Sequence, residues 1–390
     1  MNTLTQKSVY FPNLNALRCF AASMVIVHHV EQTKYLIGVN SYWDTPTVHY
    51  GCKLGLFLFF VLSGFLITNL LLLEKKNDNT INIRNFYIRR ILRIWPLYFL
   101  IIALALFVLP YFNFIQLIRD PVLVMHSNFT WKLLLFAFIL PNLVMVLFGV
   151  IPYAAHTWSI GAEEQFYLLW PVIIKFIKNK FLFAFILTLI LLYTILLKTL
   201  THFVDLFPDN KTLFVIATYL NLTPINCMAI GGLFAVTCAS DTPFFILLKK
   251  ILFSKYLQYP VFSITIILLA TGTSFYSLQY EVYSFLFGII ICNLALNKNR
   301  IIDFEKIKIF NYLGKISYGL YMFHPLVIIP VIKILVYYKC YNSYIMYLLS
   351  FGITILVSSA SYHFYEKRFI IRKVKFSTLI SGDNASKKEE

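Results

Sequence analysis

The amino-acid sequence predicts an all-α protein, a polytopic membrane bundle of about ten transmembrane helices. The 390-residue chain is 59% hydrophobic and only 13% charged, with a mean hydropathy of +0.74, whereas a soluble domain is close to a quarter charged. Many apolar runs approach the roughly 20 residues that a helix needs to cross the hydrocarbon core. Lys and Arg collect in the short connections between these runs, where signals for membrane orientation lie.

The apolar runs place ten predicted helices along the chain. Their approximate ranges are 14–36, 52–73, 91–109, 160–177, 181–199, 225–239, 259–275, 281–296, 313–336 and 343–365. The first run continues into further apolar runs, so we expect a retained helix rather than a cleaved signal peptide. We expect one membrane domain over residues 1–375. Residues 376–390 are expected to form a short polar cytoplasmic tail, too short for an appended catalytic domain.

The distribution of positive charge predicts that both termini lie in the cytoplasm. With the N-terminus assigned there, 25 of the 34 Lys and Arg residues fall on the cytoplasmic side and 8 on the other, as the positive-inside rule requires. The apolar segment 131–149 is broken by Pro141 and Asn142. We expect it to be an interfacial or re-entrant helix on the outer side, because a full span there would invert every later connection and remove the charge bias.

Several kinds of function find no support in the sequence. Six cysteines are scattered without a CxxC motif or a Cys/His cluster, so neither a disulfide framework nor a metal site is predicted. The net charge of +17 does not indicate nucleic-acid binding, because the cations lie between membrane spans, where they suit orientation and anionic lipid headgroups. The motifs of soluble hydrolases, P-loop proteins, dinucleotide-binding folds and zinc proteases are absent.

The first predicted helix carries an arginine and a histidine on one face. Arg18 and His29 are eleven residues apart, which brings them back to within about 20° of one another and separates them by about 16 Å along the axis. Ionisable groups inside a membrane normally face a cavity, a partner or a substrate path. A neutral imidazole is the usual general base for a hydroxyl. Arg18 could instead snorkel to the headgroups, and His28, about 80° from that face, is the alternative histidine.

A second group of candidates lies in the motif RNFYIRRILRIWPLY. Arg90 and Arg93 are three residues apart and therefore neighbours on one helix face, at the expected cytosolic end of the third helix. Guanidinium groups at this spacing can hold phosphates bidentately. The alternative is that these arginines bind no ligand and only orient the helix, as basic residues at the cytoplasmic ends of membrane helices do.

A third group lies in HTWSIGAEEQFYLLWP. Glu163 and Glu164 are expected near the N-terminus of the fourth helix, where the helix dipole favours negative charge, and Ser159 could cap that helix. The two acids and Tyr167 also suit binding of sugar hydroxyls, and helix capping is the alternative interpretation. Of the two acids, we rank Glu163 above Glu164 as the functional one. Trp158 is a further candidate from the same motif.

The motifs KISYGLYMFHPLV and FFVLSGFLIT supply the remaining candidates. His324 is expected near the middle of the membrane, with Pro325 loosening the helix after it and Tyr321 on the same side. A hydrogen-bonded structural histidine is the alternative. Ser63 and Gly64 lie inside the second helix, and close helix packing is the expected role of Gly64.

The motifs occur together and in order: LRCFAASMVIVHH, FFVLSGFLIT, RRILRIWPLY, TWSIGAEEQFYLLWP and SYGLYMFHPLV. The chain thereby resembles the integral-membrane acyltransferase family 3 of bacterial cell-surface modification, over residues 14 to about 327. It departs from the family pattern in its doubled His28–His29. The SGNH-type esterase domain that some members append is not found, which leads us to expect a single-step, stand-alone transferase.

The resemblance implies a multi-pass O-acyltransferase of the inner (cytoplasmic) membrane. Such an enzyme moves an acyl group, most often acetyl, from cytoplasmic acyl-CoA to a sugar hydroxyl of a polysaccharide, O-antigen or glycolipid. Acyl-CoA is then a donor substrate, with no tightly bound cofactor and no nucleic-acid partner. The family's helix-1 residues fall on Arg18 and His29, its RxxR pair on Arg90 and Arg93, and its helix-4 acid on Glu163.

These assignments predict three layers across the membrane, with arginines on the cytosolic side, carboxylates on the outer side and histidines between them. CoA phosphates would bind Arg90 and Arg93, and the pantetheine arm would pass Arg18. His29 would act as the base, either in direct transfer or through an acyl-enzyme on a histidine. A secondary transporter of a glycan or small anion is the alternative, since transporters also bury ionisable groups in membrane helices.

Overall fold

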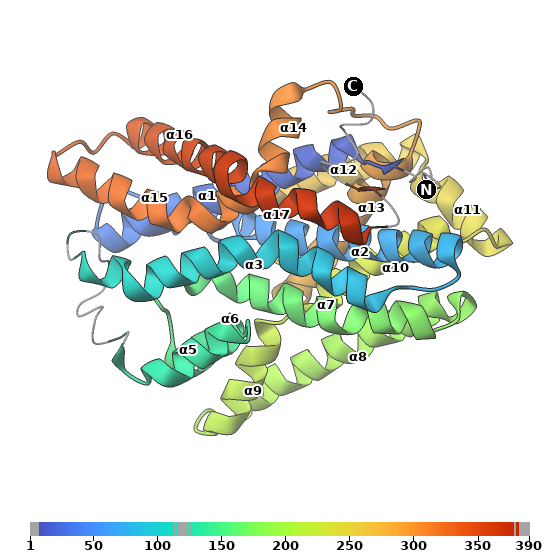
Figure 1. The fold of residues 1–390 in the computed structure, drawn as a ribbon, viewed down its shortest axis with the longest axis horizontal. Coiled ribbons are helices and arrows are strands. Elements are labelled where there is room, and N and C mark those ends of the chain that lie inside the picture. Colours follow the sequence, from blue (N-terminus) through green and yellow to red (C-terminus); the bar gives the residue numbers. More distant parts are fainter. Residues whose placement is uncertain are drawn as a thin grey trace.

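The computed structural model describes residues 8–112, 114, 117, 124, 126–377 and 380–381, and these form a bundle of helices (Figure 1). The all-helical prediction is confirmed. The described strands are two residues each: β1 (Ser8–Val9) pairs in parallel with β2 (Ile380–Ser381) and joins the two ends of the described chain. The predicted tail 376–390 lies mostly outside the described residues.

The helices of the first half of the chain are α1 (Pro12–Ile37), η1 (Thr47–Cys52), α2 (Leu54–Asp78), α3 (Ile83–Phe107), η2 (Leu109–Tyr111), α5 (Phe129–Ala137), α6 (Pro141–Phe148), η4 (Ala155–Thr157), α7 (Trp158–Phe176) and α8 (Asn179–Leu206). Those of the second half are α9 (Lys211–Asn221), α10 (Ile225–Ala239), α11 (Pro243–Leu252), α12 (Lys255–Thr271), η5 (Tyr276–Leu278), α13 (Gln279–Leu296), α14 (Lys308–Lys315), α15 (Ser317–Tyr337), α16 (Ser343–Ser361), η6 (Tyr362–Glu366), α17 (Lys367–Arg372) and η7 (Lys373–Phe376).

Within the described residues, seven helical stretches are long and apolar enough to cross a membrane, or eight if the bent pair α11 and α12 counts as one span. The seven are Thr47–Asp78, Ile83–Tyr111, Asn179–Leu206, Lys211–Ala239, Tyr276–Leu296, Ser317–Tyr337 and Ser343–Phe376. A multi-pass membrane protein is thereby supported. The predicted total of ten and the orientation of the termini stay predictions. Helices α1 and α7 are absent from this set because polar side chains interrupt their apolar sequence.

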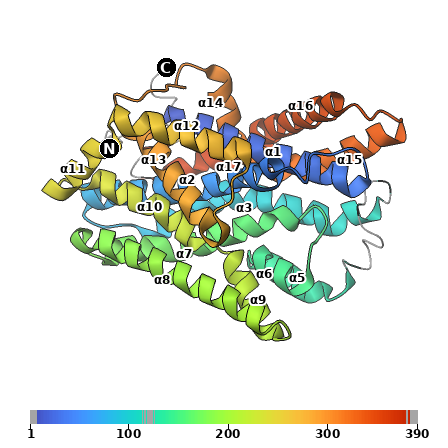
Figure 2. The same ribbon diagram turned by 180° about the vertical axis from the view of Figure 1, so that it is seen from behind.

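Helix α2 lies at the centre of the bundle, packed against α1, α7, α10 and α13. Its closest neighbour is α10, which lies between α2 and α8 (Figure 2). A Cβ atom on Gly64 would stand 1.8 Å from the carbonyl oxygen of Met228, and one on Gly231 would stand 2.1 Å from that of Val61. Small residues allow this approach of two backbones. The packing role predicted for Gly64 is therefore confirmed.

Two short helices occupy the segment 131–149. Helix α5 has nine residues and α6 has eight, with Pro141 at the first position of α6. Each is far shorter than the roughly 20 residues of a span. Asn142 exchanges hydrogen bonds with Gln165 of α7, so α6 is held against the bundle. The break at Pro141 that the sequence shows is thus the break between these helices.

Candidate functional site

One cavity contains most of the candidate residues. Its volume is about 180 Å³, more than ten times the ~10–15 Å³ that a single water needs. Side chains from α1, α2, α3, α7, α15 and η7 line it. Those that carry polar groups include Asn15, Arg18, Ser63, Arg90, Arg93, Ser159, Glu163, Tyr167, Tyr321 and Lys373. Five helices and the C-terminal segment therefore converge on one polar space inside an apolar bundle.

Three of the predicted arginines share this cavity. Arg18 donates from Nη1 to the side-chain oxygen of Asn15, at 2.8 Å on the same helix. Arg90 and Arg93 both line the cavity from α3, as expected of residues three apart on a helix. Nε of Arg90 is buried and has no hydrogen-bond partner among the described residues. A buried unsatisfied donor is unfavourable unless a ligand or water accepts from it, so this arrangement favours an anionic ligand.

A carboxylate faces these cations. Glu163 accepts hydrogen bonds from the hydroxyl of Ser63 on α2, at 2.8 Å, and from that of Tyr167 one turn along α7, at 3.0 Å. The ring of Tyr167 lies 5.9 Å from the guanidinium carbon of Arg90. Each oxygen of the carboxylate thus has a fixed donor, and the Tyr167 ring connects it to the arginine pair.

The predicted separation of arginines and carboxylates into different membrane layers is wrong, because Glu163 lies in the same cavity as Arg90 and Arg93. Helix α3 begins at Ile83 rather than at 91, so Arg90 and Arg93 lie about 10 and 15 Å along its axis instead of at its start. Helix α7 begins at Trp158, which places Glu163 about 7.5 Å inside it. The two helices therefore bring these charged residues to the wall of one cavity.

The capping explanation for the α7 motif is also wrong. The N-cap residue is Thr157 and makes no side-chain cap bond, and the first turn of α7 holds no acid. Ser159 is already inside the helix, where its hydroxyl donates to the carbonyl oxygen of His156, at 3.2 Å, and lies 2.6 Å from the hydroxyl of Tyr321. Ser159 therefore joins α7 to α15 rather than capping α7.

Two candidates of the same motif lie outside the residues that line the cavity. Glu164 accepts a hydrogen bond from Nε1 of Trp95 on α3, at 3.3 Å, and its other oxygen is buried without a partner among the described residues. Trp158 packs its ring against Phe60, with centroids 6.1 Å apart. Of the two acids, Glu163 is therefore the one in the cavity.

Three histidines lie together beyond the Tyr321 end of the cavity. The ring centroids of His29 and His324 are 4.6 Å apart, and those of His156 and His324 are 5.3 Å apart. The ring of Tyr321, which lines the cavity, lies 5.6 Å from both His156 and His324. Sequence reasoning missed His156, although it opens the motif that contains Ser159 and Glu163. Its sequence position gave no indication that η4 turns it toward α15.

Hydrogen bonds to backbone carbonyls fix the tautomers of two of these rings. Nδ1 of His29 lies 2.9 Å from the carbonyl oxygen of Val25, and Nδ1 of His324 lies 2.6 Å from that of Tyr321. A carbonyl only accepts, so each Nδ1 carries the proton and a neutral ring keeps the lone pair on Nε2. Nε2 of His324 is buried without a partner among the described residues. Each ring thus presents Nε2 as a proton acceptor.

The two adjacent histidines of α1 face different surroundings. His29 faces His324, whereas His28 has its Nδ1 3.1 Å from the carbonyl oxygen of Val48 and its ring 4.8 Å from that of Trp43. This divergence follows from the 100° turn per residue. Arg18 lies in the cavity and His29 lies in the histidine group, about 16 Å further along the axis.

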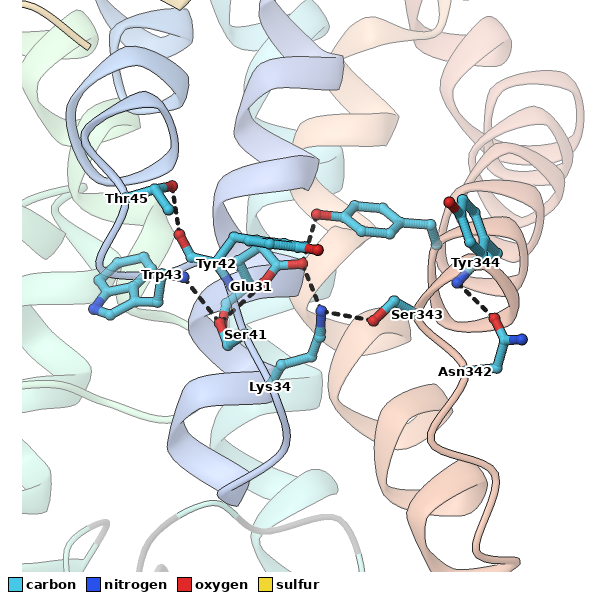
Figure 3. A network of polar contacts seen from close by, with 10 residues as sticks. Glu31, Lys34, Ser41, Tyr42, Trp43, Thr45, Asn342, Ser343 and Tyr344 are labelled. Carbon is cyan, nitrogen blue, oxygen red and sulfur yellow. Dashed lines mark hydrogen bonds and ion pairs between the residues drawn. The ribbon is translucent and has the colours of Figure 1, made fainter. Parts of the chain in front are cut away.

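A buried ion pair holds the loop that carries Trp43 (Figure 3). Nζ of Lys34 lies 2.7 Å from Oε1 of Glu31, and both side chains are fully buried. Oε2 of Glu31 accepts hydrogen bonds from the hydroxyl of Ser41, at 2.9 Å, and the backbone N–H of Tyr42, at 2.5 Å. The C-terminal end of α1 thereby fixes the loop whose next residue packs on His28.

The same pair binds α16 to α1. Lys34 donates to the hydroxyl of Ser343, at 3.1 Å, and Glu31 accepts from the hydroxyl of Tyr347, at 2.7 Å. Figure 3 shows Glu31, Lys34 and Ser343 where the two helices approach each other. Among the residues that the structure describes, no group of three or more His, Cys, Asp or Glu side chains could hold a metal ion.

The fold and the cavity define a class: a polytopic membrane protein in which a positively charged cavity meets a group of histidines. A family model described as an acyltransferase domain matches residues 11–363. The chain therefore belongs to this acyltransferase family, and the predicted membership is confirmed. It carries the acyltransferase domain of that family together with several helices that are long and apolar enough to cross a membrane.

The relatives that the chain matches are named O-acetyltransferases. O-acetyltransferase OatA of Staphylococcus aureus (strain NCTC 8325 / PS 47) is 26% identical over 366 residues, which cover 92% of this chain and 57% of OatA. A putative O-acetyltransferase of S. aureus strain COL is 31% identical over 192 residues, which cover 47% of this chain and 28% of that protein. The chain thus spans little more than half the length of OatA. No solved structure matches it.

Proposed function

We propose that the protein is an O-acetyltransferase that moves the acetyl group of acetyl-CoA to a sugar hydroxyl of a cell-surface polysaccharide, O-antigen or glycolipid. The family and the O-acetyltransferase relatives support the reaction class. The observation that carries the proposal is the cavity itself. Arg18, Arg90 and Arg93 line this cavity, and so does Tyr321. The Tyr321 ring in turn contacts two histidines, His156 and His324.

The donor binds at the cationic part of the cavity. Arg90 and Arg93 hold phosphate oxygens of CoA, for which the paired guanidinium groups are suited, and Nε of Arg90 supplies a donor that has no partner among the described residues. From there the narrow acyl-pantetheine arm extends through the cavity. Arg18 stabilises the arm on its way to the wall formed by Ser159 and Tyr321.

The acceptor meets the thioester at the histidine group. The oxygen of the sugar hydroxyl attacks the thioester carbonyl carbon, and Nε2 of His29 takes the hydroxyl proton. The carbon–sulfur bond then breaks, and the CoA thiolate leaves and takes the proton from His29, which returns the base to its neutral form. Glu163 positions the reacting groups through its hydrogen bonds to Ser63 and Tyr167. In this scheme His324 orders the base through ring contact with His29.

Release of free thiol tests the reaction. Purified protein in nanodiscs is mixed with acetyl-CoA and an oligosaccharide acceptor, and the CoA thiol is measured by its reaction with a disulfide dye. We expect acceptor-dependent thiol release, which a transporter would not produce. His29→Ala should reduce the rate by about 10²-fold or more, as loss of a general base does, while the matched variant His28→Ala keeps most of it.

Two outcomes would contradict the proposal. Wild-type protein that releases no thiol with any glycan acceptor would remove acyl-CoA as the donor. Full activity in His29→Ala, with a normal gel-filtration profile, would remove His29 as the base. Mass spectrometry of surface glycans from a deletion strain, searching for a missing acetyl substituent, identifies the acceptor.

A further inference from the structure

We propose that the loop between α1 and η1 carries a binding site for a sugar ring of the acceptor, with the indole of Trp43 as its stacking surface. This inference rests on the proposed function and deepens it, because it names where the acceptor glycan binds. Three neighbouring rings form the surface, which we call the aromatic ledge: Trp43, His49 and Tyr50. The ring centroids of Trp43 and His49 are 5.0 Å apart, and those of His49 and Tyr50 are 4.9 Å apart.

The ledge lies close to the histidine proposed as the base. The ring centroid of Trp43 is 4.8 Å from that of His28, and the centroid of His28 is 5.2 Å from that of His29. A single imidazole, that of His28, therefore separates the indole from His29. A sugar ring held on Trp43 brings the hydroxyls of that ring or of the next one within reach of Nε2 of His29.

The approach to His29 is separate from the donor cavity. His29 is half-buried, yet it is not among the residues that line the cavity, and the other histidines of its group, His156 and His324, are buried. Arg18 lies in the cavity about 16 Å before His29 along α1, whereas the loop that carries Trp43 follows the C-terminal end of this helix. The cavity and the ledge therefore lie toward opposite ends of α1, which allows two substrates to meet at the histidines.

The chemical groups of the ledge suit a sugar. A sugar ring has apolar C–H faces and a rim of hydroxyls, and sites for small ligands combine aromatic rings with a few polar groups. Tyr50 is 41% exposed, and Asp44, which follows Trp43, is also exposed. Nε1 of Trp43 has no hydrogen-bond partner among the described residues, whereas the indole N–H groups of Trp95 and Trp170 donate within the bundle. The ledge thus offers a ring face together with an N–H and a carboxylate for hydroxyls.

The loop is held in place before any ligand binds. Oε2 of Glu31 accepts from Ser41 and Tyr42, and the Ser41 hydroxyl in turn accepts from the backbone N–H of Trp43, at 3.0 Å. In Figure 3 the Trp43 ring points away from the Glu31–Lys34 pair that fixes the loop. Because the indole is already positioned, little conformational entropy is lost when a sugar binds.

The other two rings of the ledge belong to an unusual helix. Helix η1 is a π-helix of six residues, and it carries His49 and Tyr50. Turns of this kind are rare and frequently lie at functional sites. Nδ1 of His28 lies 3.1 Å from the carbonyl oxygen of Val48, so η1 is tied to α1 where the ledge meets the histidines.

The experiment compares Trp43→Ala with Trp131→Ala, a change to a tryptophan of α5 that is 64% exposed. Full-length protein in nanodiscs of phosphatidylcholine is assayed for thiol release with acetyl-CoA and with chitotetraose, maltotetraose or cellotetraose as the acceptor. For Trp43→Ala we expect the KM for the sugar to rise about tenfold, as loss of a stacked ring does, while the KM for acetyl-CoA stays as in wild type. Trp43→Phe should restore most of the affinity because it keeps a ring, and Trp131→Ala should match wild type.

The remaining outcomes decide against the inference. An unchanged KM for the sugar in Trp43→Ala removes this residue from the acceptor site. A fall in kcat alone assigns the indole to the support of the histidines. An equal rise in Trp131→Ala assigns both tryptophans to the membrane interface, where aromatic residues are common.

Binding of the sugar without acetyl-CoA separates this inference from the proposed function. Saturation-transfer NMR measures contact of the same three sugars with the wild type and the two alanine variants. A wild type that binds a sugar but releases no thiol contradicts the proposed function, and weaker binding in Trp43→Ala than in Trp131→Ala then still supports the ledge. Equal binding in the two variants, or a wild type that binds none of the sugars, overturns the inference.

Discussion

The Glu31–Lys34 pair allows a stability prediction whose size follows from the structure. Both side chains are fully buried, and removing one member of a buried pair typically costs about 3–5 kcal/mol because the other charge is left uncompensated. With an unfolding entropy of about 2.1 cal/mol/K per residue, a chain of 390 residues shifts by about 1.2 °C per kcal/mol. Lys34→Met should therefore lower the apparent Tm by roughly 4–6 °C. Glu31 keeps its hydrogen bonds from Ser41, Tyr42 and Tyr347, which favours the lower part of this range.

A double-mutant cycle isolates the pair from its surroundings. Lys34→Met, Glu31→Gln and the double variant are melted in the same detergent at one scan rate, because unfolding of such a protein is under kinetic control. The double variant should be more stable than the sum of the single losses by about 2–3 kcal/mol, the upper part of the range for contacting residues. Asp303→Asn is the control. It breaks the partly exposed bond to Arg300, and pairs of this kind contribute about 0–1 kcal/mol.

Strictly additive losses in that cycle, or a shift in Lys34→Met no larger than that of Asp303→Asn, would refute the reasoning. Either result would mean that the two charges do not stabilise each other inside the bundle. A shift that disappears at high salt would point the same way, since screening acts on exposed pairs far more than on buried ones.

Two further changes test the site and the packing of the bundle. Glu163→Gln should lower kcat by about 10²-fold, the usual cost of a misplaced group in an active site. The reason is that a neutral amide cannot accept hydrogen bonds from both the Ser63 and the Tyr167 hydroxyl. Thiol release measures the change, and an equal loss in the control variant Glu164→Gln would contradict the special role of Glu163. Gly64→Ala should destabilise by about 1–3 kcal/mol or more, because the added Cβ would overlap the backbone of Met228. Gly352→Ala is the control, because a Cβ at this position would meet no atom within 4 Å, and it should leave the apparent Tm unchanged or raised. Equal melting of the two variants would contradict the close packing of Gly64 on Met228.

The sequence alone predicted the fold class because hydrophobicity is a local property that each apolar run displays by itself. The break at Pro141 and the packing of Gly64 were predicted for the same reason, since each depends on one residue type. The start of α3 was misplaced because polar residues extend this helix about two turns before its apolar run. Arg90 and Arg93 therefore lie inside the helix and not at its end, and the predicted layers failed with them.

The sequence predicted individual residues of the candidate site, but not the contacts between residues that lie far apart in the chain. Helical phase separated His29 from His28, and spacing paired Arg90 with Arg93. No local pattern places Ser159 against Tyr321, or brings His156 beside His324, because these contacts join residues about 165 positions apart. Nor does any local pattern place Lys373 of the C-terminal segment at the wall of the same cavity as Arg18.

Two of the helices that line the cavity, α1 and α7, are less apolar than the seven long apolar stretches of the described chain. Helix α1 carries Arg18 and His29, and α7 carries Glu163 and Tyr167. These side chains lower the apolar character of both helices, and in contact with lipid they would be costly. The cost is offset because the rest of the bundle surrounds them and these four side chains each meet a hydrogen-bond partner or the cavity. Polar lining residues also come from α2, α3 and α15, whose sequences are apolar enough to cross a membrane, so helices of both kinds contribute to the cavity.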